Sequence, residues 1–239
     1  PPRSTLFPYT TLFRSIPIGL DFQKLSPLYS DLRKDGPFWT ILGSRQNGKS
    51  NFLLSMIYHL DKDYPNKVQM TLIPFRRGPL SRIVDTSNRR LIMGADQIIE
   101  TCSQISEDIQ NQPDTMHIVL MDDLGIAYSS GNSALVSALN QLGDQLNILG
   151  QDNFMVVIAD LYSNLKTSQT YNSSFLKLFQ QSQAGIFFSK DDSDMQWFNT
   201  PISLQQKKAL KILPGRGFFV SQGKAEFIQT PLLDINEIS

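Results

Sequence analysis

The stretch FWTILGSRQNGKS, residues 38–50, decides the fold that we predict from the sequence. Its first five residues form a nearly continuous apolar run, which is typical of a strand buried on both faces of a parallel sheet. Residues 43–50 match the pattern G-x-x-x-x-G-K-[ST] at every required position. From Lys49 to Leu60, apolar side chains then recur at helical spacing. This order predicts a phosphate-binding loop, and the alternative is a glycine turn that leads into an ordinary helix.

The chemistry of phosphate binding needs each part of this loop. The glycines let backbone N–H groups point inward around phosphates, and the helix that follows directs its positive end to the same place. Lys49 would reach the β- and γ-phosphates, and the Ser50 hydroxyl would bind Mg²⁺, which prefers few protein ligands beside phosphate oxygens and water. The residues predicted to bind the nucleotide in this region are Gly43, Ser44, Arg45, Gln46, Asn47, Gly48, Lys49, Ser50 and Asn51.

A second apolar strand, predicted for residues 117–121, ends in the two carboxylates Asp122 and Asp123. The C-terminal ends of parallel strands line the ligand crevice of such a sheet. We therefore predict that Asp122 lies beside Ser50 and holds Mg²⁺ through water. Asp123 and Lys49 are the predicted catalytic residues, with Asp123 facing the γ-phosphate and orienting the attacking water. The alternative for the two carboxylates is a solvated turn or a helix cap.

Enzymes with this kind of site usually carry Glu at the second acidic position, and Asp123 is one methylene shorter. A displacement of about 1 Å at a group that positions water can lower the rate roughly 100-fold. The sequence therefore supports nucleotide binding better than turnover.

The rest of the chain alternates apolar strands with amphipathic helices. Further strands are predicted at residues 68–73, 154–159 and 185–189, and helices after a cap at Asp96, after Asn132 or Ser133, and at 174–181. Short extended pieces at 16–35 would lie at the edge of the core, and residues 218–220 and 224–228 would form a hairpin. The pattern predicts an α/β fold with a mostly parallel, doubly wound sheet and a C-terminal antiparallel hairpin.

Composition excludes several classes of protein. The 239 residues suit one large domain with additions, at 41% hydrophobic and 18% charged residues. The 22 basic residues balance the 22 acidic ones, which excludes a strongly cationic nucleic-acid coat but not a local patch. A single cysteine excludes an internal disulfide framework, and no apolar run reaches the 18 residues of a membrane span.

Residues 1–15, PPRSTLFPYTTLFRS, show no strand or helix period and resemble a translated sequencing adapter. We expect this segment to be a non-native scar, and the alternative is a native extended arm. The domain would then run from residue 16 to 239, as a C-terminal fragment of something longer.

Four stretches together resemble a known family. They are IPIGLD at 16–21, LYSDL at 28–32, the strand ending in two aspartates, and LPGRGFFV at 213–220 before the hairpin. With the phosphate loop, they resemble an FtsK/SpoIIIE-like ATPase domain of the EccC/EssC type, the motor of type VII secretion. The resemblance covers about residues 16–239. It implies a RecA-like P-loop NTPase fold, with ATP and Mg²⁺ at 43–50 and 122–123, and with Pro214 and Gly215 near the adenine.

The resemblance also implies a setting for the domain. Family members carry several such domains in tandem on one membrane-anchored chain, and this sequence resembles the last of them. The implied partners are adjacent ATPase domains, the tail of a secreted helical-hairpin substrate, and further copies of the chain, at the cytoplasmic face of the membrane. Hydrolysis is expected to be weak.

Two other functions compete with the secretion motor. One is a DNA translocase domain of the same superfamily, which the zero net charge disfavours because phosphate contacts need clustered cations. The other is a docking module that binds nucleotide without hydrolysing it, which the short carboxylate of Asp123 favours.

Several charged clusters have a functional and a structural interpretation. The arginines at 76, 77, 82, 89 and 90 suit a solvated loop face, an arginine finger for a neighbouring subunit, or a nucleic-acid contact, and we favour the loop face. Asp160 is either a sensor of the γ-phosphate or a structural cap before residues 162–165, and we favour the cap. Solvated positions are predicted for Asp191, Asp192, Asp194, Lys207, Lys208 and Lys211.

The cysteine, the two histidines and the aromatic stretches also have structural interpretations. Cys102 is predicted in the core, and neither His59 nor His117 has a metal partner at useful spacing. The aromatic stretches 195–198 and 176–179 belong either to the core or to a groove for a partner peptide. If they form a groove, we expect the tail of a secreted substrate to bind there.

Overall fold

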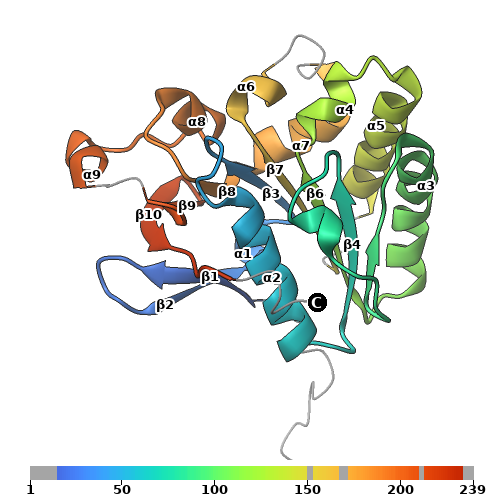
Figure 1. Cartoon of the computed structure of the whole chain (residues 1–239), viewed down its shortest axis with the longest axis horizontal. Helices are drawn as coiled ribbons and strands as arrows, with labels where there is room; N and C mark the ends of the chain where they lie inside the picture. The colour runs from blue at the N-terminus through green and yellow to red at the C-terminus, as the bar shows by residue number, and fades with distance from the viewer. Residues whose placement is uncertain (1–14, 150–152, 167–171, 210–212, 234–239) are drawn as a thin grey trace, which may run out of the picture.

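The computed structural model describes residues 15–149, 153–166, 172–209 and 213–233, which form one sheet with helices on both faces (Figure 1). Ten strands lie within these residues. In chain order they are β1 (Ser15–Asp21), β2 (Pro27–Asp31), β3 (Phe38–Leu42), β4 (Val68–Pro74), β5 (Arg89–Leu91), β6 (Met116–Asp122), β7 (Phe154–Asp160), β8 (Ala184–Phe187), β9 (Arg216–Ser221) and β10 (Lys224–Gln229).

The sheet has a parallel part and an antiparallel part. Its strand order is β2-β1-β10-β9-β8-β3-β7-β6-β4-β5. The six strands from β8 to β5 are parallel, and β9, β10, β1 and β2 continue the sheet in antiparallel pairs. This confirms the predicted α/β fold, the mostly parallel sheet and the C-terminal hairpin, which is β9–β10.

The helices cover the two faces of the sheet unequally. Helix α2 packs on one face together with a 3₁₀ turn at Leu80–Arg82, and α3, α5 and α7 pack on the other. The helical elements are α1 (Leu32–Asp35), α2 (Lys49–Asp63), α3 (Ala95–Asn111), α4 (Gly125–Ser129), α5 (Ser133–Ile148), α6 (Tyr162–Leu165), α7 (Ser174–Ser182), α8 (Asp192–Trp197) and α9 (Leu204–Ala209).

The central strands are apolar throughout because each lies between two cores. In β3, Trp39 and Ile41 face the core under α2, whereas Phe38 and Leu42 face the core under α3, α5 and α7. Successive side chains of a strand point to opposite faces, so both sets must be apolar. Strands β6 and β7 divide their residues between the same two cores.

The two edges of the sheet differ in how well the sequence predicted them. The extended pieces expected at 16–35 are β1 and β2, which form one edge. The opposite edge is β5, where the sequence predicted a loop. Arg89 is buried there because its guanidinium pairs with Asp61 of α2 and donates to the Val84 carbonyl oxygen at 2.8 Å. The prediction of a solvated face is therefore wrong for Arg89.

Of the two predicted helix N-caps, the structure has the one on α5 but not the one on α3. Asn132 caps α5, since its Oδ1 accepts a hydrogen bond from the Leu135 N–H at 3.1 Å. The predicted cap at Asp96 is wrong, because α3 begins at Ala95, with Gly94 at the cap position. Asp96 lies instead in the first turn of α3, where a carboxylate favours the positive end of the helix.

The aromatic stretches at 176–179 and 195–198 are largely buried, as the core alternative predicts. Leu176, Phe179 and Phe198 have no exposed surface, and Met195 and Trp197 expose less than a tenth of theirs. The indole N–H of Trp197 donates to the Thr40 hydroxyl at 3.0 Å. The core alternative therefore holds for most of these side chains, whereas Trp197 and Met195 each also line a pocket at the surface.

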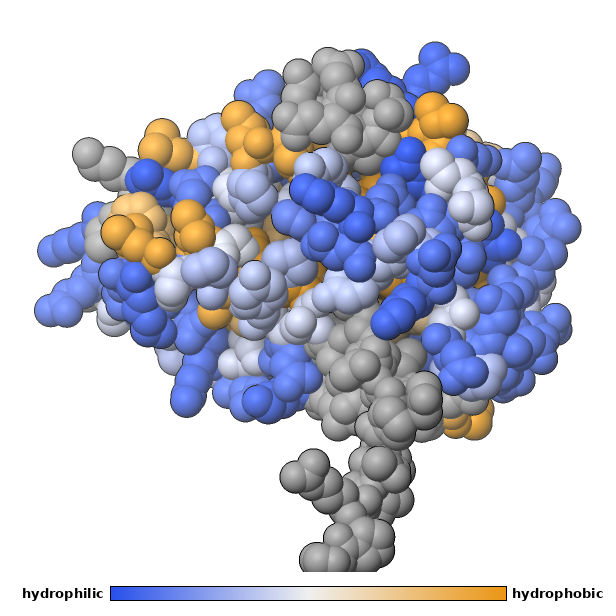
Figure 2. Space-filling model, turned by 90° about the horizontal axis from the view of Figure 1, so that it is seen from below, coloured by the Kyte–Doolittle hydropathy of each residue, from blue (hydrophilic) through white to orange (hydrophobic). Residues whose placement is uncertain are grey.

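The remaining surface is mostly hydrophilic on the face shown in Figure 2, with hydrophobic residues in small separate groups. Large exposed apolar side chains gather at the β1–β2 hairpin, where they include Leu20, Leu25 and Tyr29. Across the described residues, none of the helices combines the length and the apolar character that a membrane span requires. The predicted scar lies outside the described residues except for Ser15, the first residue of β1, and Lys211 also lies outside them.

Candidate nucleotide-binding site

The loop at residues 43–48 joins β3 to α2 and is fixed from two sides. The side-chain amide of Asn47 donates to the Phe188 carbonyl oxygen at 2.9 Å, and the backbone oxygen of Asn47 accepts from the Gly215 N–H at 2.9 Å. Gly48 has φ 110°, and a Cβ there would approach the Gly215 nitrogen to 2.7 Å. Only glycine allows this close approach, so the 214–215 turn lies directly against the loop.

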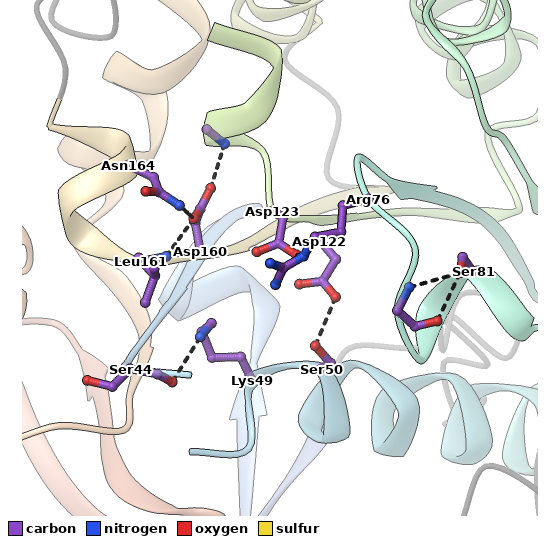
Figure 3. A network of polar contacts seen from close by, with 12 residues as sticks. Ser44, Lys49, Ser50, Arg76, Ser81, Asp122, Asp123, Asp160, Leu161 and Asn164 are labelled. Atoms are coloured by element: carbon purple, nitrogen blue, oxygen red, sulfur yellow. Dashed lines mark hydrogen bonds and ion pairs between the residues drawn. The ribbon is translucent and has the colours of Figure 1, made fainter. Parts of the chain in front are cut away.

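Lys49 opens α2 and turns its side chain back into the loop. Its Nζ donates to the Gly43 carbonyl oxygen at 2.7 Å. It also donates to the Ser44 carbonyl oxygen at 3.1 Å (Figure 3). The residue is buried, and this burial lowers the pKa of Lys49. The ammonium group is therefore held at the mouth of the loop by two neutral acceptors that an anion could replace.

Ser50 and Asp122 meet across the site, as the sequence predicted. The Ser50 hydroxyl donates to Asp122 Oδ2 at 2.9 Å, which joins the first turn of α2 to the end of β6 (Figure 3). Burial of the Asp122 carboxyl, together with the neighbouring charge of Asp123, raises its pKa to about 6. Within the described part of the chain there is no cluster of three metal-ligating side chains, so this pair would need phosphate oxygens and water to complete a Mg²⁺ shell.

Asp123 forms an ion pair that the sequence did not single out. Its Oδ2 lies 2.6 Å from Nε of Arg76, which follows the end of β4 (Figure 3). The Asp123 backbone has φ 60°, in the left-handed region. Its N–H donates to the Ala159 carbonyl oxygen at 2.8 Å, and this bond fixes the carboxylate at the cavity edge.

Asp160, at the end of β7, is a structural residue, which agrees with the favoured prediction. It is fully buried, and its carboxylate accepts from the N–H groups of Gly125 at 2.5 Å and Leu161 at 2.6 Å, and from the Asn164 amide at 2.7 Å. These bonds fix the starts of α4 and α6 beside the cavity. Burial raises the pKa of Asp160 despite them.

The acidic stretch 191–194, which forms the start of α8, differs from its prediction. Asp194 is buried and accepts a hydrogen bond from the Ser189 hydroxyl at 2.5 Å, so it is not a solvated position. Asp192 remains exposed and pairs with Lys207. No pattern in the sequence distinguishes the inward-facing Asp194 from Asp191 and Asp192.

These elements enclose a cavity of about 580 Å³. The sequence did not assign Arg76, Asn164 or Leu232 to it. Asn51 was predicted to bind nucleotide, but its amide donates to the Pro231 carbonyl oxygen at 2.6 Å and its Oδ1 accepts from the Leu233 N–H at 3.0 Å. The lining consists of Arg45, Gln46, Gly48, Lys49, Ser50, Asn51, Arg76, Pro79, Asp122, Asp123, Ile126, Leu161, Asn164, Pro214 and Leu232.

Comparison with known proteins finds a similar curated protein and several solved structures with a similar fold. No protein-family model matches the chain. The chain is 27% identical over 230 residues to the ESX secretion system protein YukB of Bacillus subtilis (strain 168), covering 91% of this chain and 15% of YukB. EssC (ATPases 2 and 3) from Geobacillus thermodenitrificans matches with a TM-score of 0.73 and 17% identity, over 95% of this chain and 43% of that chain.

EccC (ATPases 2 and 3) from Thermomonospora curvata, solved in complex with a signal sequence peptide, matches with a TM-score of 0.68. It is 19% identical over 94% of this chain and 41% of that chain. The chain thus has the fold that is found in this class of ATPase domains. Within that class, the chain resembles an ATPase domain of the EccC/EssC type, which confirms the resemblance predicted from the sequence. It spans less than half the length of these relatives.

Proposed function

We propose that the chain binds Mg-ATP between the 43–50 loop and the ends of β6 and β7, as an ATPase domain of a type VII secretion motor. The observation that carries this proposal is the 2.9 Å contact between the Ser50 hydroxyl and the Asp122 carboxylate at the mouth of the loop. A hydroxyl and a carboxylate are the protein groups that Mg²⁺ takes beside a triphosphate. The cavity lining supports the same ligand, because Gly48, Lys49 and Ser50 at the start of α2 all line it and the positive end of a helix favours phosphate.

Three side chains of this site have separate roles in the proposal. Lys49 exchanges the two carbonyl oxygens it now contacts for phosphate oxygens, which carry a full charge and bind an ammonium more strongly. Ser50 and Asp122 hold the metal, and Asp122 is mostly ionised at neutral pH because its pKa is about 6. Bound Mg²⁺ would neutralise charge on the phosphates.

Nucleotide binding can be tested by titration calorimetry of the chain with Mg-ATP. We expect Lys49→Ala to weaken binding at least tenfold, because a charge-assisted contact to phosphate is lost. Lys62→Ala is the matched control, since Lys62 lies near the far end of the same helix and outside the cavity. Equal affinity of wild type and Lys49→Ala would refute the nucleotide site.

The wider setting of the domain is part of the same proposal. We infer a longer, membrane-anchored chain in which this domain works at the cytoplasmic face, beside other ATPase domains and further copies of itself. The likeness to YukB and to tandem ATPase domains of EssC supports this setting. The complex of the similar EccC domains with a signal sequence peptide supports a secreted helical-hairpin tail as the partner.

A peptide partner and a DNA partner are separated by their dependence on salt. Fluorescence anisotropy at about 150 mM salt, with labelled tail peptide and labelled duplex in parallel, should show peptide binding alone. The zero net charge provides little counterion release, so duplex binding should be lost between about 50 and 200 mM salt. Salt-resistant duplex binding without peptide binding would favour the DNA translocase, and nucleotide-dependent peptide binding without hydrolysis would favour the docking module.

A further inference from the structure

Arg76 stands on a rigid turn at the edge of the proposed nucleotide cavity. The turn follows β4, and the N–H of Phe75 donates to the Asp122 carbonyl oxygen at 3.0 Å, which ties the root of Arg76 to the end of β6. On the other side, Ser81 bonds both the N–H and the carbonyl oxygen of Gly78, and Leu80 is fully buried. The backbone of Arg76 is therefore fixed while its long side chain is free to reorient.

The guanidinium of Arg76 is only partly used by the protein. Its Nε donates to Asp123 Oδ2 at 2.6 Å, and the side chain is 49% exposed. Among the described residues, no other acceptor contacts it. A guanidinium has five N–H donors in a planar fork, which suits two oxygens of one phosphate. Most of its donors thus remain available to a ligand in the cavity that Arg76 lines.

The charges of the cavity also favour an exchange of partners. Three basic side chains line the cavity, those of Arg45, Lys49 and Arg76. Two carboxylates line it as well, those of Asp122 and Asp123. A triphosphate carries more negative charge than the single carboxylate that now holds Arg76, and phosphate accepts bidentate hydrogen bonds. The guanidinium would therefore move from Asp123 to a phosphate that comes within its reach.

The place of Arg76 in the cavity determines which phosphate its guanidinium would contact. Lys49 and the 43–48 loop surround the entry to α2, and the 214–215 turn lies against Gly48. Arg76 instead reaches the cavity from the β4–β6 side, next to the two carboxylates (Figure 3). A nucleotide with its base toward Pro214 would bring its last phosphate to this side.

We propose that Arg76 binds the γ-phosphate of ATP bound by its own chain, and that Asp123 holds the guanidinium in place until nucleotide arrives. The proposal rests on the proposed nucleotide site. It makes Arg76 the residue that distinguishes ATP from ADP, and it releases the Asp123 carboxylate toward water only when a γ-phosphate is present. Among the interpretations of the arginine cluster, this one differs from a finger that reaches a neighbouring subunit.

The test compares Mg-ATP and Mg-ADP affinities of the purified chain by calorimetry. We expect Arg76→Ala to weaken ATP binding about 10- to 100-fold, which is the range for a hydrogen bond to a charged group, and to change ADP binding less than about threefold. Arg77→Ala is the matched control, because Arg77 is the exposed neighbour that does not line the cavity. Arg76→Gln, which keeps the first methylenes and a polar end but removes the guanidinium, is a second variant that guards against misfolding.

Each alternative outcome contradicts the proposal in a distinct way. Equal weakening of ATP and ADP would mean that Arg76 acts only through the general charge of the cavity. Unchanged affinities for both nucleotides would make the Arg76–Asp123 pair purely structural. If wild type binds neither nucleotide, the proposed function fails and this inference fails with it, whereas binding of both with an unchanged ratio in the variants refutes the inference alone.

Discussion

Asp122 and Asp123 are neighbours in sequence, yet their carboxylates have different surroundings. Asp122 is the last residue of β6, buried and bonded to Ser50. Asp123 turns into the left-handed region, which costs a non-glycine residue on the order of 1 kcal/mol, and its carboxylate pairs with Arg76. This backbone reversal points two adjacent acids at two different partners, Ser50 and Arg76, as the two separate roles in the proposed site require.

We predict that the isolated chain hydrolyses ATP more slowly than about 1 s⁻¹, the low end of ordinary enzymes. The short Asp123 side chain sets its carboxylate back from the water that it would orient, because Asp is one methylene shorter than Glu. Asp123→Glu should raise turnover, by up to about 100-fold if this distance is the main defect. Steady-state phosphate release measures both rates, and turnover well above 1 s⁻¹ in wild type would contradict the prediction.

At the scale of elements, the sequence predicted what depends on patterns along the chain. The apolar runs of β3, β6 and β7 were visible because both faces of these strands are buried, and α2 was visible from its spacing. The site was predictable for the same reason: the 43–50 loop is local, and parallel strands place Asp122 at the same edge.

What the sequence missed depends on contacts between distant residues. Strand β5 is three residues long, and its residues Arg89 and Arg90 pair with carboxylates on α2 and α3. Similarly, the inward turn of Asp194 needs the Ser189 hydroxyl, and the burial of Trp197 needs Thr40 on β3. Sequence alone predicts a charged residue to be solvated unless its partner is known. The burial of these residues could therefore be found only from the structure.

The pair between Arg89 and Asp61 should therefore stabilise the β5 edge. We predict that Asp61→Ala lowers the free energy of unfolding by about 2–4 kcal/mol, because it leaves a buried guanidinium without that carboxylate. Asp63→Ala is the control, since Asp63 is half exposed and lies 3.7 Å from His59, so its loss should cost less than about 1 kcal/mol. Urea denaturation measures both, and equal effects would contradict the role given to Asp61.

For the whole molecule, buried ionisable groups make stability depend on pH in opposite directions. Burial lowers the pKa of His117 on β6, against the nearby charge of Asp108 and together with that of Arg90. Its Nε2 has no hydrogen-bond partner among the described residues. Burial raises the pKa of Asp194, although the Ser189 hydroxyl partly offsets this. The two groups therefore bind protons differently in the folded and unfolded chain.

The sign follows for each group. As the pH falls below about 6.5, the unfolded chain protonates His117 first, so this residue reduces stability in acid by at most about 1.4 kcal/mol per pH unit. Asp194 acts in reverse, because the folded chain protonates it first, and it adds stability as the pH falls toward 3.8. We predict that His117→Gln keeps more of its stability than wild type between pH 7 and pH 5, whereas Asp194→Asn loses the gain in acid. Urea denaturation from pH 7 to about pH 4, a range that reaches the window of Asp194, measures both. His59→Gln is the partly exposed control on α2. Parallel profiles for wild type and His117→Gln would show that burial of this histidine does not govern the acid response.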